Sequence, residues 1–279
     1  MKHLKKQTLI LLSIASLLLV GLAVFAHIHK KEEKPSYSNL NSKASLSEVR
    51  SILSKHLNEE SVDNFINLVT DYNDTVGSVG LSGSFAPFTK TDYDVEKISG
   101  LWTAKHGDFI GTNCRINTYT LLKGKIKIPQ VKSDSELLFQ DKDAIDKGKL
   151  FDAKDQENFD ILFSRVKTEA TQDVKVHAKH MEDYYKQFTF DNKARMLSVV
   201  VHDNLDGDYL FVGHVGVLVP TTDGYLFVEK LTFEEPYQAI KFASKKDCYK
   251  YLTTKYKDYT GPGLAKPFIM DNDKWVDMD

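Results

Sequence analysis

The chain contains few cysteines, glycines and prolines, and it has no excess of positive charge. Its 279 residues include 2 Cys, 15 Gly and 7 Pro, which excludes a disulfide-dense scaffold, a zinc module built on four thiolates and a collagen-like repeat. Lys and Arg total 37 against 39 Asp and Glu, so no basic surplus is present to neutralise phosphates. We therefore expect no nucleic-acid partner. The length suits a domain with a sizeable core.

The first 34 residues differ in composition from the rest. Lysines precede a charge-free, mostly apolar run over residues 8–26, and histidines and further lysines follow it. This arrangement predicts a signal peptide cleaved after Ala26, or an uncleaved anchor that crosses the membrane. In both cases the rest of the chain lies outside the cytoplasm, either secreted or membrane-anchored. Polar residues with Pro, Ser and Asn then predict a linker over residues 35–44.

The remaining chain changes from helical to strand patterns along its length. Helical periodicity predicts helices over residues 45–57, from residue 58 onward, 93–105, 137–145, 159–170, 174–187 and 244–257, and residues 73–91 read as a long loop. Apolar and β-branched runs predict strands over residues 196–202, 209–219, 225–233 and 267–270, with Asp-Gly turns between the first three. Helices followed by an antiparallel meander indicate an α+β fold, with a highly charged helical segment over residues 125–194.

Cys114 is predicted to lie in the first turn of a short helix. Gly111, Thr112 and Asn113 are turn and capping residues, an apolar stripe follows the cysteine, and Gly124 ends the segment. A helix N-terminus and a nearby histidine lower the pKa of a thiol from about 8.5 and make it a better nucleophile. Cys114 is therefore a candidate nucleophile, although a lone free cysteine is usually a small core residue.

His214 and Glu229 are the candidate partners of this thiol. His214 lies on an apolar strand with a glycine close on each side, and these glycines leave space beside the imidazole. A four-residue loop over 221–224 pairs Pro220 with Tyr225, and any even-length loop places His214 and Glu229 on one face of the sheet. Glu229 could then orient the imidazole as a general base. The three residues together favour a catalytic Cys–His–Glu site.

This order of residues resembles the papain-like cysteine peptidases, and more closely their NlpC-type branch of bacterial cell-wall amidases and endopeptidases. The motifs that carry the resemblance are Asn113-Cys114, His214-Val215-Gly216-Val217 and Phe227-Val228-Glu229. Residues 45–279 also resemble an uncharacterised group of exported bacterial proteins of the same superfamily. In that comparison the matching motifs are Gly111–Arg115, Pro236–Ala239 and Pro267–Met270.

The resemblance implies a papain-like cysteine hydrolase domain over residues 45–279, in which residues 125–194 are an insertion. Cys114 would attack an amide of a peptide or of cell-wall peptide, with His214 as base and Glu229 as the third residue. The Cys114 amide and the Asn113 side chain would hold the oxyanion. Arg115 and Asn117 would contact the substrate, or else they are exposed helix residues. We expect a monomer without a cofactor.

The sequence departs from the branch in several places, which leaves a second function open. The branch usually has Asp before the cysteine, Ser-Gly after it, and His, Asn or Gln as the third residue, where this chain has Asn113, Arg115-Ile116 and Glu229. These differences would fit an exported, non-catalytic binding module with a degenerate papain-like site. A Cys114–Cys248 disulfide would also remove the nucleophile, and the alternative is that Cys248 is a core thiol.

Two further motifs suggest metal ligands. His177 and His180 have a spacing that can bind zinc, but the sequence places no third ligand beside them, and a solvated helix face is the alternative. The acidic segment over 203–208 resembles a calcium loop, yet Leu205 and Gly207 stand where oxygen ligands belong. We therefore expect a hairpin turn there and no metal site in the chain.

Overall fold

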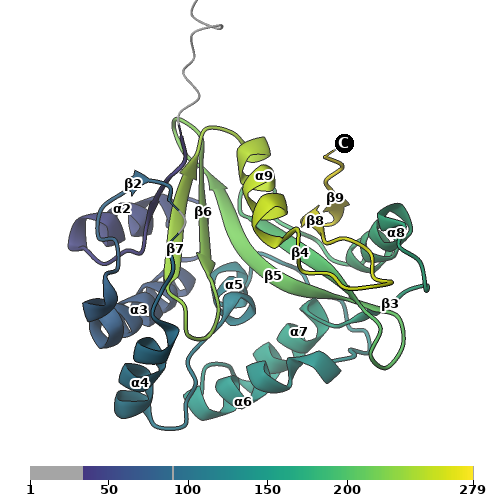
Figure 1. The fold of residues 1–279 in the computed structure, drawn as a ribbon, viewed down its shortest axis with the longest axis horizontal. Helices are drawn as coiled ribbons and strands as arrows, with labels where there is room; N and C mark the ends of the chain where they lie inside the picture. Colours follow the sequence, from purple (N-terminus) through teal and green to yellow (C-terminus); the bar gives the residue numbers. More distant parts are fainter. Residues whose placement is uncertain (1–33, 90, 279) are drawn as a thin grey trace, which may run out of the picture. The chain divides into compact units, whose positions relative to one another are not determined.

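An antiparallel sheet forms the centre of the described structure (Figure 1). The computed structural model describes residues 34–89 and 91–278. Within them the strands are β1 (Ser36–Ser38), β2 (Ala86–Pro87), β3 (Val166–Lys167), β4 (Arg195–Asp203), β5 (Tyr209–Pro220), β6 (Tyr225–Lys230), β7 (Tyr237–Phe242), β8 (Phe268–Asp271) and β9 (Lys274–Trp275). They are ordered β2-β1-β7-β6-β5-β4-β8-β9, and β3 pairs with β5. Together with eight helices, these strands confirm the predicted α+β class.

Helices cover both faces of this sheet. They are α2 (Lys43–Leu53), α3 (Glu59–Val76), α4 (Val95–His106), α5 (Cys114–Leu122), α6 (Phe139–Gly148), α7 (Ala153–Leu162), α8 (Val174–Tyr185) and α9 (Lys245–Tyr256). Helices α3 and α5 pack in the larger core cluster with Val215, Val217 and Val228 of the sheet. Helix α9 packs in a smaller cluster with Leu197, Leu218 and Phe227. Successive strand residues point to opposite faces, so the two clusters occupy the two sides of the sheet.

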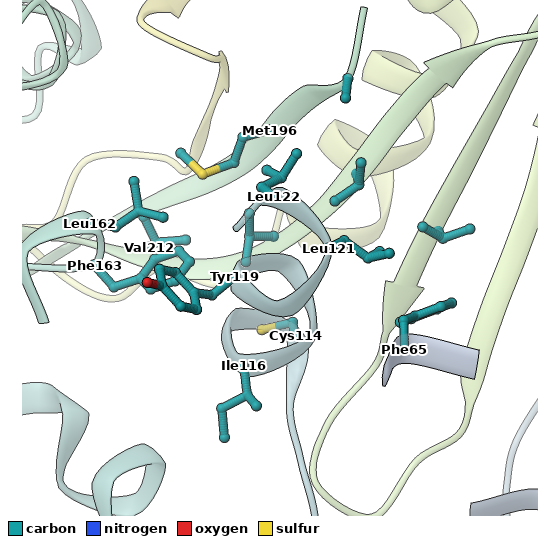
Figure 2. Packing of buried hydrophobic residues seen from close by; sticks show 14 of the residues in the cluster. Phe65, Cys114, Ile116, Tyr119, Leu121, Leu122, Leu162, Phe163, Met196 and Val212 are labelled. Carbon is teal, nitrogen blue, oxygen red and sulfur yellow. The ribbon is translucent and has the colours of Figure 1, made fainter. Parts of the chain in front are cut away.

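Side chains radiating from α5 fill much of the larger cluster. Figure 2 shows Ile116, Tyr119, Leu121 and Leu122 around this helix, with Cys114 in its first turn. All of them are buried. The polar residues Asn117, Thr118 and Thr120 of α5 are buried as well, so the sheet and the surrounding helices enclose this helix on nearly every side.

Strands β5 and β6 pair at one end and separate at the other. The ladder runs from Pro220↔Tyr225 to Val217↔Val228, which confirms the predicted register of the hairpin. Beyond it, Glu229 pairs with Gln238 of β7 and no longer with β5. Helix α5 contacts both β5 and β6. The separation of the two strands thus opens the sheet where His214 and Glu229 lie.

A β-bulge lies directly before His214. Val199 of β4 pairs with His214 and Val200 pairs with Val212, so Gly213 is the additional residue. A bulge re-aims the side chains that follow it. A Cβ on Gly213 would meet Val201 at 2.8 Å, and one on Gly216 would meet the Phe227 ring at 2.4 Å. The absence of a side chain at these glycines therefore makes room for Val201 and Phe227, and the expected space beside the imidazole stays a prediction.

Several predicted segments differ from the structure. The predicted loop over 73–91 contains the end of α3, which runs to Val76, and strand β2, and the predicted strand over 225–233 ends at Lys230. Two further differences arise from strand pairing. The proposed linker over 35–44 contains β1, which lies between β2 and β7, and Ser42, which caps α2. The predicted helix over 159–170 ends at Leu162, because the chain then turns into β3 and pairs with β5. Long-range strand pairing overrides the local pattern in both cases.

The charged segment over 125–194 packs into the main core. Leu138, Phe159 and Met181 from this segment belong to the larger cluster, together with residues of α3 and α5. The predicted hairpin turn over 203–208 is confirmed, since it joins β4 to β5. The apolar run over 8–26 lies outside the described residues. Within the described residues, the structure contains no helix long and apolar enough to cross a membrane.

Candidate active site

Cys114 is the first residue of α5. Asn113 is the N-cap, and its side-chain oxygen accepts a hydrogen bond from the Ile116 amide at 3.0 Å. This capping bond explains why the helix begins at the cysteine. The partial positive charge at a helix N-terminus favours a thiolate there. Cys114 is buried, with 5% of the residue exposed.

Cys114 forms a hydrogen bond with His214 of β5. Burial alone would raise the pKa of the thiol, but the charge of His214, this hydrogen bond and the charge of Arg115 lower it below its ordinary value. Burial would likewise lower the pKa of His214, and the bonds and charges of Cys114 and Glu229 raise it. These opposite shifts favour a thiolate–imidazolium pair.

Glu229 of β6 holds the other side of the imidazole. The His214 Nε2 atom lies 2.6 Å from Glu229 Oε2. A carboxylate only accepts hydrogen bonds, so Nε2 is the donor and Nδ1 is left to face the thiol. Both side chains are almost completely buried, and the Tyr256 ring of α9 stacks on the imidazole at 4.7 Å. The geometry brings the three sequence-predicted residues Cys114, His214 and Glu229 together in one hydrogen-bonded row.

Asp141 of α6 holds the start of α5, a role that no local sequence pattern indicates. This carboxylate is fully buried and accepts two bonds from the Arg115 guanidinium, at 2.9 and 2.8 Å. It also accepts a bond from the Asn113 amide at 2.7 Å. Because this acid comes from the segment predicted as an insertion, residues 125–194 contribute directly to the placement of the cysteine.

The predicted ligand roles of Asn113, Arg115 and Asn117 receive no support from this geometry. The Asn113 amide nitrogen is bonded to Asp141 and its oxygen caps the helix, so neither is directed to an oxyanion. The third nitrogen of Arg115 donates to the Val212 carbonyl. Asn117 is buried and donates to the Thr112 hydroxyl and the Asn113 carbonyl. Neither Arg115 nor Asn117 is the exposed helix residue that the sequence also allowed.

The two cysteines are not bonded to each other. Both are free and buried, and they belong to different core clusters. Burial raises the pKa of Cys248 well above its ordinary value. Cys248 is thus a core thiol, and Cys114 remains available as a nucleophile.

The candidate zinc histidines are structural. His177 is buried, with one ring nitrogen on the Thr168 hydroxyl and the other on the Thr171 carbonyl, whereas His180 faces Glu169. The prediction of a solvated helix face is therefore wrong for His177. No group of three or more His, Cys, Asp or Glu within residues 34–89 and 91–278 could hold a metal ion.

Lys230 is a buried lysine beside the site that no sequence motif indicates. Its Nζ atom donates to the carbonyls of Thr232 at 2.8 Å, Phe233 at 3.0 Å and Glu235. The same atom lies 4.2 Å from the centre of the Tyr72 ring. Burial lowers the pKa of Lys230 to about 7. The lysine thereby fixes the loop between β6 and β7.

Comparison with known proteins identifies the family without a function. No curated protein and no solved structure matches the chain. One family model, described as a domain of unknown function (DUF4300), matches residues 36–276 and so spans the whole sheet and all of the helices above. The chain belongs to this DUF4300 family.

Proposed function

We propose that the chain is a thiol-dependent hydrolase that cleaves an amide bond through an acyl-enzyme. The observation that carries this proposal is the row formed by Cys114, His214 and Glu229, with the thiol at a helix N-terminus. A nucleophile bonded to a base, with the base oriented by a third group, is the arrangement that nucleophilic catalysis requires. In this proposal the fold is papain-like, as the order of the three residues suggests.

The proposed reaction has two stages. The Cys114 thiolate attacks the amide carbonyl and forms a C–S bond, and the His214 imidazolium protonates the nitrogen as the C–N bond breaks. The amine leaves, and His214 then takes a proton from water. The resulting hydroxide attacks the thioester, the C–S bond breaks, and the acid and the thiolate–imidazolium pair are released. Glu229 keeps Nε2 protonated throughout, which directs Nδ1 to the reacting atoms.

The backbone at the start of α5 would stabilise the oxyanion. The first N–H groups of a helix have no carbonyl partner within the helix, and the amide of Cys114 lies next to the attacking sulfur. The Asn113 side chain is used for capping and for Asp141, so we assign the oxyanion to the backbone.

We further propose that the substrate is a peptide or a cell-wall peptide met outside the cytoplasm. The support is the apolar run over residues 8–26 and the resemblance to the NlpC-type branch. The protein would act either after secretion or while anchored through that run, as a monomer.

Alkylation of Cys114 tests the mechanism without a known substrate. Iodoacetamide is small and uncharged, so it suits a thiol that is only 5% exposed. We expect the rate of Cys114 modification in the wild type, followed by mass spectrometry, to have a midpoint pH well below about 8.5. The midpoint should rise towards that value in His214→Ala. Cys248→Ser serves as a matched control that removes the other thiol and leaves the profile unchanged.

The same proteins are then incubated with cell-wall peptide fragments. Release of an amine by the wild type but not by Cys114→Ser would support the hydrolase. Modification of Cys114 only after unfolding, together with binding but no cleavage of these fragments, would contradict it and favour a non-catalytic binding module.

A further inference from the structure

Glu229, the third residue of the row, is a carboxylate at a buried position, where an ionised group is unfavourable unless it is paired. Glu229 is 2% exposed, and its side chain is wholly enclosed. An ionised carboxylate in such a place must be paired and hydrogen-bonded, whereas a neutral Asn or Gln would need less compensation. The structure therefore has to contain groups that make a buried glutamate workable here.

Helix α9 supplies these groups to one oxygen of the carboxylate. The Tyr251 hydroxyl donates to Glu229 Oε1 at 2.5 Å. The Lys255 ammonium lies 3.5 Å from the same oxygen and donates to the Tyr251 hydroxyl at 2.9 Å. The other oxygen, Oε2, is left to His214. The two oxygens thus have separate tasks, since α9 fixes one and the imidazole binds the other.

The spacing of residues along α9 brings these groups to one place. Tyr251 and Lys255 are four residues apart, so they share one face of the helix. Tyr256 follows Lys255 and stacks on the His214 ring. The same helix therefore contacts both members of the His214–Glu229 pair.

We propose that Tyr251 and Lys255 are positioning residues that keep Glu229 ionised and turned towards His214. This inference rests on the proposed function, because it assigns Glu229 its partner in the same site. Neither residue touches the reacting atoms, and both act through the carboxylate.

The charges around Glu229 agree with this assignment. The titratable groups that face it are His214 from β5 and Cys248, Tyr251, Lys255 and Tyr256 from α9. The opposed residue of β7 is the uncharged Gln238. Burial alone would raise the pKa of Glu229, and Lys255 first, then His214 and Tyr251, bring it down to about 2. Without the ammonium, Glu229 binds a proton at a higher pH and supports the imidazolium less.

The test is the acid limb of the pH profile for Cys114 alkylation by iodoacetamide. In Lys255→Met we expect its midpoint to rise by about one pH unit, which is about a tenfold slower reaction at a fixed pH on that limb. Tyr251→Phe should raise it by less, because the ammonium remains. Lys255→Arg should restore the wild-type profile. Lys250→Met is the matched control, because it removes the same charge from an exposed position of α9.

A double variant shows whether the effect passes through Glu229. Lys255→Met should leave the profile of Glu229→Gln unchanged, because a neutral amide has no charge to support. The proposal would be overturned if Lys255→Met shifted the midpoint pH equally in the wild type and in Glu229→Gln. It would also be overturned if Lys255→Met had the wild-type profile. A wild-type Cys114 with an ordinary thiol profile would overturn the proposed hydrolase itself, and the two failures are therefore distinguishable.

Discussion

The single ionisable residues of the site work only as a set. Cys114, His214 and Glu229 are each almost fully buried, and burial alone would favour the neutral form of each. Their mutual contacts reverse this preference for Cys114 and His214, whereas for Glu229 the charge of Lys255 acts first and His214 second. The pKa is therefore lowered for Cys114 and Glu229 and raised for His214. Removing one charge should therefore change the titration of the others.

Glu229 should make stability depend on pH in the acid range. Its pKa is about 2 in the folded protein, below its ordinary value of 4.5, so the folded state binds fewer protons than the unfolded state between these values. This contribution is complete above about pH 4.5 and is lost as the pH falls towards 2. The wild type should thus lose roughly 3 kcal/mol of its free energy of unfolding over this pH range through Glu229. In Glu229→Gln we expect this loss to be absent.

Urea unfolding at a series of pH values from 2 to 6 measures this loss. Other carboxylates titrate in the same range. The measurement therefore compares the slope of the free energy of unfolding against pH in the wild type with the slope in Glu229→Gln. Parallel curves for the two proteins would show that Glu229 is not held ionised in the folded state.

At the scale of helices and strands, two buried charged side chains connect segments that are separate in the sequence. Asp141 connects α6 to the start of α5 through Arg115 and Asn113. Lys230 connects the end of β6 to the loop that leads into β7. In each case one side chain satisfies several polar groups, so its loss leaves more than one of them unpaired.

Asp141→Asn should destabilise the protein strongly. The substitution leaves the guanidinium of Arg115, whose side chain is 15% exposed, without its counter-charge. Breaking a buried ion pair in this way costs roughly 3–5 kcal/mol. The matched control is Asp143→Asn on the same helix, whose partner Lys147 is a surface residue, and the expected change there is below about 1 kcal/mol. Chemical denaturation compares the two, and similar losses would contradict the assignment.

Lys230→Met should loosen the loop between β6 and β7. The methionine fills most of the volume of the lysine but leaves the carbonyls of Thr232, Phe233 and Glu235 without their donor. We expect a loss of roughly 3 kcal/mol or more and faster hydrogen exchange of residues 231–236. Lys241→Met, which removes a partly exposed ion pair with Glu48 and a contact with the Phe85 ring, should have a much smaller effect on both measurements. Unchanged exchange in the loop would show that the lysine does not hold it.

The elements that the sequence predicted well depend on neighbours along the chain. Asn113 is a good N-cap residue, so the helix beginning at Cys114 follows from local rules. The register of β5 and β6 follows from the length of one loop, and it aligns His214 with Glu229. These two local features account for much of the arrangement of Cys114, His214 and Glu229.

The features that the sequence did not predict depend on contacts across the fold. Asp141 is an ordinary acid in a charged segment until α6 brings it to Arg115. Lys255 is one of several lysines in α9, and only the tertiary structure distinguishes it from Lys250. The bulge at Gly213 is defined by the pairing of β4 with β5, which no local pattern records. Each of these features depends on contacts between residues that are far apart in the sequence.

At the scale of the whole molecule, the first strand ties the N-terminal helices to the sheet. β1 lies between β2 and β7, and Asn39, which follows it, donates to the Tyr237 carbonyl at 2.9 Å. The Asn39 oxygen atoms also accept bonds from the Ser82 amide and the Asn73 side chain. Residues 35–279 form one compact unit that includes this strand.

A pair of shortened chains tests this role of β1. A chain that begins at Pro35 should unfold at the same temperature as the 279-residue chain, because it keeps every strand and helix of the compact unit. A chain that begins at Ser42 retains the N-cap of α2 but lacks β1 and Asn39, which exposes the edge of β7. We expect it to lose several kcal/mol and to melt on the order of 10 °C lower. Circular dichroism measures both transitions, with Asn39→Ala in the longer chain giving an intermediate value. Equal melting temperatures would show that β1 and Asn39 do not stabilise the sheet.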